Sequence, residues 1–452
     1  MRLSAATACH MSGTVARPAY DREAQAGGIV HIGVGAFTRA HQAAYTDATM
    51  GQGDADWMIT GVSMRSAGVA DQLNPQGGLY LIAECSGAGT RYRLTGAIRK
   101  VLVAGEDPAA LVAVIADPAT RIVSFTVTEK GYCRTPKGTL DLGLADAGGF
   151  YPLLAAAMRM RRDTNAGGLT LLCCDNLAHN GRVLEGLMRE YLAARAPDLA
   201  HWFAQACTSP STMVDRIVPA TTEADRTAAM IETGLEDFAL VVTEPFSQWV
   251  IEDRFAAGRP RWEAVGVRLV DDVAPYETAK LRMLNGAHSL LAYCGLAAGH
   301  TFVHEAIAEP MLRGAAEALM VDAAATIATA PGQDLAAYGA SLIERFSNRA
   351  LSHRLMQIAM DGSQKLPQRW LETLAIRQAQ GVACPTILGG LAAWIGHLRG
   401  LNGIVDDPLA AELLVASRAS CPTTALFGGN GILRSAWVPT PDDIDGINRR
   451  LG

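Results

Sequence analysis

The chain contains 452 residues, of which 49% are hydrophobic and 19% are charged, and its formal net charge is −6. This length exceeds what one hydrophobic core supports, so we expect two domains of a globular protein and not a disordered chain. The acidic balance, without a long basic run, argues against nucleic acid and membrane surfaces as partners. No apolar run approaches the roughly 20 residues of a membrane-spanning helix, and the N-terminal residues lack the apolar core of a secretory signal.

The cysteines are nine in number and scattered, and none is spaced CxxC. Cys173 and Cys174 are adjacent in an apparent buried strand, which is typical of core thiols in a reducing cytoplasm. No HExxH motif or Cys/His group indicates a zinc site, so the sequence predicts no metal.

A loose arm at residues 1–28 is expected to lead into a strand, a glycine turn and a helix. The stretch GIVHIGVG at 28–35 is typical of a short strand that ends in the turn, and residues 36–50 have helical character. This order is that of the first unit of a dinucleotide-binding fold.

Within this unit, Gly33 can adopt a positive φ angle, and Gly35 lets a pyrophosphate approach the backbone. The helix N-terminus at Ala36 and Phe37 then offers amide donors and partial positive charge to a phosphate. Thr38 stands where the third glycine of the usual fingerprint is expected, so a tight structural turn is the alternative interpretation.

A second strand is predicted at residues 57–63, and its end is where a dinucleotide-binding fold places an acid for the adenosine ribose. The chain instead continues SMRS at 63–66, while Asp54 and Asp56 precede the strand. Arg65 would favour a 2′-phosphate, so the residues leave NAD and NADP open. A solvent-facing arginine in a loop is the structural alternative.

Further strands and helices alternate through the first half of the chain. Strands are predicted at 121–128, 169–174, 238–243 and 267–272, and helices at 107–116, 151–163 and 183–195. Such alternation predicts a mainly parallel sheet with helices on both faces.

Polar residues follow two of these strands, at the edge where open α/β sheets bind ligands. Glu129 and Lys130 follow the strand at 121–128, and Asn176 follows the strand at 169–174. We predict ligand contacts for these side chains, with an ordinary turn asparagine as the alternative for Asn176.

Beyond residue 275 the sequence predicts only helices. They lie at 305–329, 334–347, 370–379 and 387–399, and residues 420–438 are expected to form a surface loop. The chain is therefore predicted to be an α/β half over residues 1–274 followed by an all-α half over residues 275–452.

The stretch PYETAKLRMLNGAHS at 275–289 opens the second half and, apart from Gly286, favours an α-helix. At roughly 100° per residue, His288 lies about 80° and Asn285 about 140° from Lys280 around a mainly apolar surface. An amine, an imidazole and a carboxamide would thus surround a core-like face. The alternative is an ordinary amphipathic helix whose Lys280 extends to solvent.

Two further polar pairs are candidates for substrate contacts. Asp215 and Arg216 lie between apolar neighbours, which fits either a buried ion pair or a carboxylate that accepts substrate hydroxyls. Lys365 and Arg369 lie in a polar turn at 361–369 and could bind hydroxyls or a carboxylate, with a charged surface loop as the alternative.

Six segments together resemble the mannitol dehydrogenase family, the long-chain polyol-specific dehydrogenases and reductases that also include fructuronate reductases. They are IVHIGVGAFTRAHQ at 29–42, VTEKGY at 127–132, CDNLAHNG at 174–181, TMVDRIVP at 212–219, EPFSQWVIED at 244–253 and YETAKLRMLNGAHS at 276–289. The resemblance implies a Rossmann-type, dinucleotide-binding N-terminal domain and a mostly α-helical C-terminal domain for substrate and catalysis. It also implies metal-independent chemistry with a nicotinamide cofactor.

By this resemblance, Lys280 matches the catalytic lysine of the family, and Asn285 and Asn176 match its two carboxamides near the reacting oxygen. His288 and Asp215 match substrate-contacting positions.

The sequence departs from the family pattern at Thr38, where a histidine is common, and at 64–65, where some members carry an acid. The second departure weakens the inference of NAD. The expected cofactor is NAD, and NADP stays open.

The expected reaction needs a group that accepts the hydroxyl proton while hydride leaves the alcohol carbon. Without zinc, Lys280 takes this role, and burial and neighbouring positive charge must lower its pKa from about 10.4 by about two units. Asn176 and Asn285 would donate hydrogen bonds to the developing oxyanion, and His288 would hold the hydroxyl.

The cationic pair Lys365 and Arg369 favours a uronate substrate, so mannonate/fructuronate is expected, with mannitol/fructose as the close rival. Other possible functions are a catalytically silent dinucleotide-binding sensor and a zinc-dependent polyol dehydrogenase. We expect a cytoplasmic enzyme, monomeric or a small homo-oligomer, whose partner is a small molecule.

Overall fold

The computed structural model describes residues 1–135 and 137–451. The chain forms two compact units, Met1–Val273 and Ala274–Gly452. Each has its own apolar core: the buried side chains of the first unit lie on either side of a sheet, and those of the second lie among helices.

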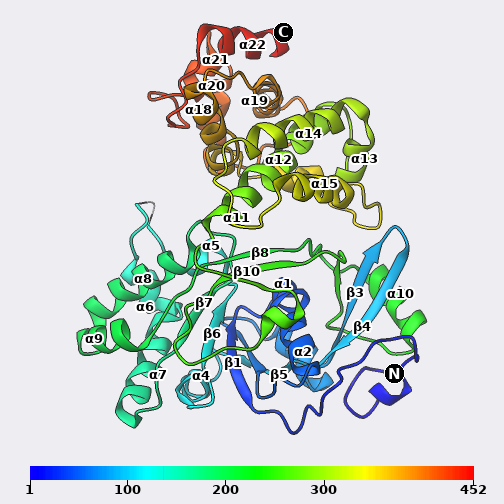
Figure 1. Cartoon of the computed structure of the whole chain (residues 1–452), viewed down its shortest axis with the longest axis vertical. Coiled ribbons are helices and arrows are strands. Elements are labelled where there is room, and N and C mark those ends of the chain that lie inside the picture. The colour runs from blue at the N-terminus through cyan, green and yellow to red at the C-terminus, as the bar shows by residue number, and fades with distance from the viewer. Residues whose placement is uncertain (136, 452) are drawn as a thin grey trace. The chain divides into compact units, whose positions relative to one another are not determined.

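The first unit is built on a five-stranded sheet (Figure 1). Its strands are β1 (Gly27–Ile32), β2 (Met58–Ser63), β5 (Ile98–Val103), β6 (Ile122–Phe125) and β7 (Thr170–Cys173), in the order β5-β2-β1-β6-β7. All neighbouring pairs are parallel, so the predicted mainly parallel sheet of a Rossmann-type domain is confirmed. The chain runs outward from β1 through β2 to β5 and then returns to β6, so the strand order reverses between β1 and β6. At such a switch point the loops diverge and leave room for a ligand.

Helices cover both faces of this sheet. On one face the core includes α4 (Pro108–Ala116), α7 (Tyr151–Thr164) and α8 (Asn180–Arg195). The other face packs against α2 (Gln42–Gly51) and α3 (Gly68–Leu73). The first unit also contains η1 (Ala8–His10), η2 (Asn74–Gln76), α5 (Thr128–Gly131), α6 (Leu142–Gly148), α9 (Pro197–Ala206), α10 (Glu223–Thr233) and η3 (Trp262–Val265).

Two smaller sheets complete the first unit, and the sequence did not reveal them. One pairs β3 (Tyr80–Ser86) with β4 (Gly89–Thr95) and β9 (Val241–Thr243); the other joins β8 (Thr212–Asp215), β10 (Gln248–Glu252) and β11 (Arg268–Val270). The strands expected at 238–243 and 267–272 therefore exist but lie outside the main parallel sheet. The hairpin of β3 and β4 was missed altogether.

The N-terminal arm is not loose, so that expectation was wrong. Leu3 and Val15 are buried, and the Leu3 amide donates to the Glu236 carbonyl at 2.8 Å. Ala16 forms a bridge with Arg93 on β4. Apolar side chains at intervals in the arm therefore hold it against the first unit.

The named elements in the described part of the second unit are all helices, as predicted, and two isolated β-bridges join Phe302 to Arg354 and Phe427 to Leu433. Its elements are α11 (Ala274–Ala279), η4 (Lys280–Leu284), α12 (Asn285–Ala297), α13 (Val303–Ala308), α14 (Pro310–Ala324), α15 (Leu335–Phe346), α16 (Leu355–Ala359), α17 (Gly362–Leu366), η5 (Pro367–Leu371), α18 (Glu372–Ala379), α19 (Pro385–Leu398), α20 (Ala410–Ser417), α21 (Pro422–Leu426) and α22 (Pro441–Leu451). The helix α12 is buried along most of its length and packs against α14, α16 and α19.

Two expectations for this unit need correction. The helix expected at 305–329 is two helices, α13 and α14, because Pro310 begins a new first turn after the extended Glu309. The stretch 420–438 is not simply a surface loop: it contains α21, and Trp437 within it is 1% exposed.

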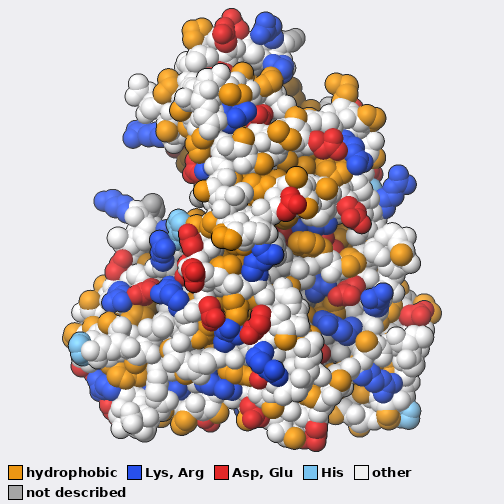
Figure 2. Space-filling view, in the orientation of Figure 1, with side chains coloured by type: hydrophobic (Ala, Val, Ile, Leu, Met, Phe, Trp, Pro, Cys, Tyr) orange, Lys and Arg blue, Asp and Glu red, His pale blue; other side chains and the backbone are white. Residues whose placement is uncertain are grey.

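Charged side chains are mixed on the surface. On the face shown in Figure 2, Lys and Arg side chains are interspersed with Asp and Glu, so the net charge of −6 does not gather in one acidic patch there. No helix in residues 1–135 and 137–451 has both the length and the apolar character needed to cross a bilayer.

Candidate active site

A cavity of about 480 Å³ lies in the first unit at the carboxyl ends of the central strands. The residues after β1, β2 and β6 line it, as expected for a ligand site at the switch point of an open parallel sheet. Its lining residues are Gly33, Val34, Gly35, Ser63, Met64, Arg65, Ser66, Val69, Thr126, Val127, Thr128, Lys130, Gly131, Cys133, Gly148, Gly149 and Phe150.

The glycine turn after β1 requires glycine for two different reasons. Gly33 has φ = 92°, and a Cβ there would lie 2.1 Å from the Thr126 carbonyl oxygen. At Gly35 the backbone is extended, with φ = −88°, which any residue can adopt, and a Cβ would meet no protein atom closer than 3.8 Å. Because Gly35 lines the cavity, a side chain there would enter the cavity itself. Gly33 thus permits the turn, and Gly35 keeps space for a ligand next to the backbone.

A buried hydrogen-bond network of hydroxyl groups around His31 supports the glycine turn. The His31 ring forms hydrogen bonds with Ser124 Oγ (2.7 Å), Thr126 Oγ1 (2.8 Å) and Thr38 Oγ1 (2.6 Å). Thr126 Oγ1 also donates to the Gly33 carbonyl at 2.7 Å. Burial lowers the pKa of His31 to about 3, so the ring is neutral. Thr38, which replaces the third glycine of the fingerprint, is therefore part of the support for the turn.

The helix expected at 36–50 is broken. It consists of α1 (Ala36–Ala40) and α2, separated at His41, whose backbone is not helical. The His41 ring packs between Phe37 and Trp249, with centroid distances of 5.0 and 5.5 Å. No proline or glycine in the sequence signals this break.

Asp175 fixes the opposite wall of the cavity. Its carboxylate accepts hydrogen bonds from the amides of Val127 (2.9 Å) and Thr128 (3.1 Å) and from the Tyr132 hydroxyl (2.7 Å). Thr128 has φ = 62°, which is uncommon for a threonine. The hydrogen bonds from the Val127 and Thr128 amides to Asp175 hold the backbone in this conformation. Burial raises the pKa of Asp175 above its usual value, and the three donors oppose that rise.

The predicted cofactor-binding residues divide into two groups. Gly33, Gly35, Arg65 and Lys130 line the cavity. The other three, Ala36, Phe37 and Glu129, are not among its lining residues, and their assignment stays a prediction. Thr126 and Val127, which also line the cavity, were missed, although they too lie at the end of a strand.

Asn176 and Asp215 follow strands of the first unit. Asn176 lies in the turn after β7, next to Asp175, and Asp215 is the last residue of β8 and is buried. The neighbouring Arg216 is buried too: it donates to the Glu244 carbonyl and forms an ion pair with Glu84 at 2.7 Å. These bonds fix the backbone on which Asp215 lies.

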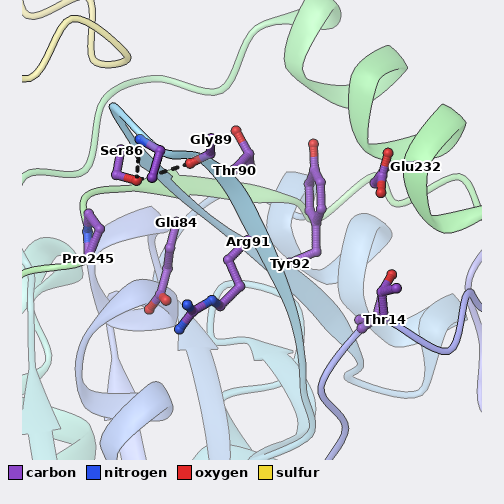
Figure 3. A pocket seen from close by; sticks show the side chains of 11 residues that line it. Thr14, Glu84, Ser86, Gly89, Thr90, Arg91, Tyr92, Glu232 and Pro245 are labelled. Atoms are coloured by element: carbon purple, nitrogen blue, oxygen red, sulfur yellow. Dashed lines mark hydrogen bonds between the residues drawn. The ribbon is translucent and has the colours of Figure 1, made fainter.

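Glu84 belongs to a second cavity of the first unit, about 510 Å³ in volume, beside the β3–β4 hairpin. Figure 3 shows Glu84 on one strand of the hairpin and Arg91 and Tyr92 on the other, with Glu232 of α10 nearby. None of the predicted site residues lines this cavity. Its connection to the candidate site is through the ion pair of Glu84 with Arg216.

The central helix of the second unit is not a regular α-helix. Residues Lys280–Leu284 form η4, a turn of π-helix in which the Asn285 amide donates to the Lys280 carbonyl. This bond spans five residues, so Asn285 lies one turn along the same face as Lys280 and not about 140° away. His288 is three residues further along α12 and shares that face. The wide turn is what aligns the three predicted side chains.

Two of these side chains have polar atoms that no residue in the described part of the chain satisfies. Asn285 and His288 are 8% and 7% exposed, and neither Asn285 Nδ2 nor His288 Nε2 has a hydrogen-bond partner there. Leaving a buried polar atom without a partner costs about 1–3 kcal/mol. In a native protein such atoms usually mark a place where a ligand or water binds.

Positive charge surrounds His288. Burial lowers its pKa well below the usual value, and His353, Arg345, Arg369 and Lys280 add to the effect. The ring also packs against Phe346 and His353, with centroid distances of 4.6 and 5.2 Å. His288 is therefore a neutral imidazole. No motif in the sequence indicates Arg345 or His353, which approach from other segments.

Arg369 and Lys365 lie in helical turns, so the predicted polar turn at 361–369 was wrong. Arg369 lies in η5, a second π-helical turn that begins at Pro367 and packs against η4. It donates to Ser289 Oγ (2.8 Å) and to the Asn285 carbonyl (3.3 Å), and burial lowers its pKa to about 10. Lys365, in contrast, donates to the Met360 carbonyl at 2.5 Å.

η5 meets α12 at Gly286. The Trp370 indole donates to the Gly286 carbonyl at 3.1 Å, and a Cβ at Gly286 would come 3.2 Å from the Leu319 side chain and 3.4 Å from the Arg369 carbonyl oxygen. Arg369 therefore lies next to α12.

No group of three His, Cys, Asp or Glu side chains in residues 1–135 and 137–451 is arranged so that it could hold a metal ion.

Comparisons with known proteins match both units. Residues 27–264 match the family model described as the mannitol dehydrogenase Rossmann domain, and residues 272–420 match the mannitol dehydrogenase C-terminal domain. The D-mannonate oxidoreductase of Escherichia coli is 40% identical, over 96% of this chain and 94% of its own length. The polyol:NADP oxidoreductase of Gluconobacter oxydans is 39% identical, over 85% and 83%. The solved mannitol 2-dehydrogenase of Pseudomonas fluorescens, a ternary complex with NAD and D-mannitol, is 34% identical with a TM-score of 0.86, over 100% of this chain and 96% of that chain.

Proposed function

Because the chain belongs to the mannitol dehydrogenase family of oxidoreductases, we propose that it transfers a hydride between a nicotinamide dinucleotide and a secondary alcohol or ketone of a sugar derivative. The general acid/base of the reaction is Lys280, and no metal takes part.

The cavity of the first unit fits a dinucleotide. Its floor includes the glycine turn after β1, where the backbone at Gly35 is open to a phosphate, and two cations, Arg65 and Lys130, lie on its walls. Asp175 holds the loop of Val127 and Thr128 against one side of this space. A bound nicotinamide dinucleotide supplies the two-electron acceptor or donor for the reaction.

Lys280 exchanges the proton of the reacting hydroxyl. To accept a proton near neutral pH its amine must be uncharged, which requires an environment that disfavours the ammonium. Arg345 and Arg369 act on His288 together with Lys280, so all three cations lie in one region of the second unit. Their mutual repulsion favours the neutral amine.

Asn285 and His288 bind the reacting oxygen, and their unsatisfied atoms are the observation that carries the proposal. Asn285 Nδ2 and His288 Nε2 are buried without a partner in the described residues, on the helical face that begins with Lys280. A carboxamide donor that meets an oxygen as negative charge develops is worth roughly 3 kcal/mol. Asn176 supplies a second carboxamide, and Asp215 accepts a hydrogen bond from a substrate hydroxyl.

The substrate is a hexonate/hexuronate pair such as mannonate and fructuronate, or a hexitol/ketose pair such as mannitol and fructose. Positive charge in the second unit favours the first pair, since Arg345, Arg369 and Lys280 all act on His288. Lys365, whose amine donates to the Ile358 and Met360 carbonyls, is kept as a further candidate contact for the carboxylate. The similarity to the D-mannonate oxidoreductase supports the same choice.

The test is a comparison of fructuronate with fructose as substrates for the full chain, with NADH or NADPH and with EDTA in a parallel series. We expect reduction of at least one ketone, faster for fructuronate, and no effect of the chelator. Nucleotide binding without turnover of either ketone would instead support a silent sensor. Loss of activity in EDTA, restored by zinc, would contradict metal independence.

A further inference from the structure

The nucleotide cavity has an arginine and two serines where an acid for the ribose is expected. Ser63 is the last residue of β2, Arg65 and Ser66 follow it, and all three line the cavity. In a Rossmann-type sheet this position faces the adenosine ribose: a carboxylate binds the free 2′-hydroxyl of NAD, and an arginine accommodates the 2′-phosphate of NADP.

The charge of the cavity also favours a 2′-phosphate over a free 2′-hydroxyl. Its lining residues include two cations, Arg65 and Lys130, and no Asp or Glu. The acids that precede this segment, Asp54 and Asp56, lie before β2, at the opposite end of the strand. Both are engaged there: Asp54 accepts from the Arg261 amide at 2.5 Å and Asp56 from the Ala26 amide at 2.7 Å. Neither can take the place of the missing ribose ligand.

Arg65 is available for a phosphate. Its side chain is exposed, and it forms neither a hydrogen bond nor an ion pair with any residue in the described ranges. Arg216 of the same unit, in contrast, is bound to Glu84 and to backbone carbonyls. A guanidinium without protein partners breaks no protein hydrogen bond or ion pair when it binds a phosphate through two parallel hydrogen bonds.

The two cations of the cavity also lie on different sides of the glycine turn. Arg65 follows β2 and Lys130 follows β6, and these strands flank β1 on either side. The ribose of the adenosine half lies on the β2 side of a Rossmann-type sheet. Arg65 is therefore the cation next to the 2′-position, and Lys130 is not.

We propose that Ser63, Arg65 and Ser66 form a subsite for a 2′-phosphate, so that the chain uses NADP(H) in preference to NAD(H). The identity of the ligand as a nicotinamide nucleotide rests on the proposed function. The guanidinium of Arg65 binds two phosphate oxygens, and the two serine hydroxyls donate to the same group.

The adenosine half of the cofactor tests this subsite without any turnover. Calorimetric titration of the full chain with adenosine 2′,5′-bisphosphate and with 5′-AMP should give at least tenfold tighter binding of the bisphosphate. Arg65→Ala should bring the two dissociation constants to within about twofold of each other while 5′-AMP binding stays unchanged. Arg226→Ala, which removes an arginine from α10 outside the cavity, should leave the wild-type ratio intact.

Steady-state kinetics give the second measurement. The ratio of kcat/KM for NADPH to that for NADH should exceed ten in the wild type and fall to about one in Arg65→Ala. Equal binding of the two adenosine ligands by the wild type would overturn the proposal, as would a ratio that Arg65→Ala does not change. The binding experiment decides the matter even if no sugar is reduced, so failure of the subsite and failure of the proposed function are told apart.

Discussion

Asn285 and His31 are both buried polar side chains, but they differ in whether their polar atoms have hydrogen-bond partners. Each ring nitrogen of His31 has a hydroxyl partner, and the network serves only to hold the glycine turn. Asn285 Nδ2 and His288 Nε2 are buried as well but have no partner among the residues described. Burying such atoms without a partner lowers stability, and a hydrogen bond to a substrate oxygen can restore it. We therefore assign a structural role to His31 and a substrate-binding role to Asn285 and His288.

The neutral state of His31 makes stability depend on pH. Its folded pKa of about 3 lies below the usual 6.5, so the unfolded chain binds the proton more readily and stability is lost as pH falls below 6.5. The loss approaches about 1.4 kcal/mol per pH unit well below pH 6.5 and amounts to about 2 kcal/mol between pH 6.5 and 4.5. His31→Gln removes this titration, so its unfolding free energy should fall less over the same range.

Urea unfolding of the wild type and of His31→Gln at pH 4.5, 5.5, 6.5 and 7.5 measures this difference. Other groups, such as Asp175 with its raised pKa, titrate alike in both proteins and cancel. The free-energy gap between the two should narrow steadily toward low pH. A gap that stays constant would mean that His31 is not held neutral.

Of the two π-helical turns, the sequence contains a recognisable cause for η5 but not for η4. η5 begins at Pro367, whose missing amide and bulky ring disrupt the regular helical bonds, so a wide turn there has a cause in the sequence. η4 contains neither proline nor glycine, and its residues favour an ordinary α-helix. Helical periodicity therefore identified Lys280, Asn285 and His288 but placed Asn285 on the wrong side. Tertiary packing against η5, which no local pattern encodes, accompanies the shift.

The glycine turn provides a matched pair of substitutions at this scale. Gly33→Ala places a Cβ 2.1 Å from a carbonyl oxygen at a positive φ, so we expect a large drop in Tm and loss of nucleotide binding. Gly35→Ala meets no protein atom closer than 3.8 Å, so Tm should stay close to that of the wild type. Its methyl group enters the cavity, and the dissociation constant for the nucleotide should rise at least tenfold.

Thermal unfolding and nucleotide titration of both variants check this pair. A Gly35→Ala variant that binds nucleotide as tightly as the wild type would show that the cavity beside the turn is not the cofactor site. An unchanged Tm for Gly33→Ala would contradict the steric argument for the turn.

For the whole molecule, the sequence predicted the architecture better than the boundaries of its parts. The parallel sheet, the helical second half and the order of the family motifs follow from buried apolar strands and helical periodicity, and the structure confirms the fold class. The β3–β4 hairpin is local, with only Gly87 and Ala88 between its strands, and it was missed although a glycine-containing turn of this length is a hairpin signal. The docked N-terminal arm and the buried Trp437 were missed, because each depends on contacts between distant segments. The same holds for the site: Gly33 and Lys280 were identifiable from local motifs, whereas Arg345 and His353 were not.

The central claim for the whole molecule is that an amine, and not a metal, exchanges the proton. Lys280→Ala should lower kcat by about 10²–10⁴-fold, the usual contribution of a general base, while the dissociation constant for the nucleotide stays within twofold. Lys100→Ala, which removes an exposed amine from β5, is the control and should keep full activity.

Chemical rescue of Lys280→Ala by a small primary amine tests that claim most directly. Methylamine should restore part of the lost turnover, in proportion to the concentration of its uncharged form, and should leave wild type and Lys100→Ala unaffected. Near-normal turnover of Lys280→Ala without added amine would contradict it.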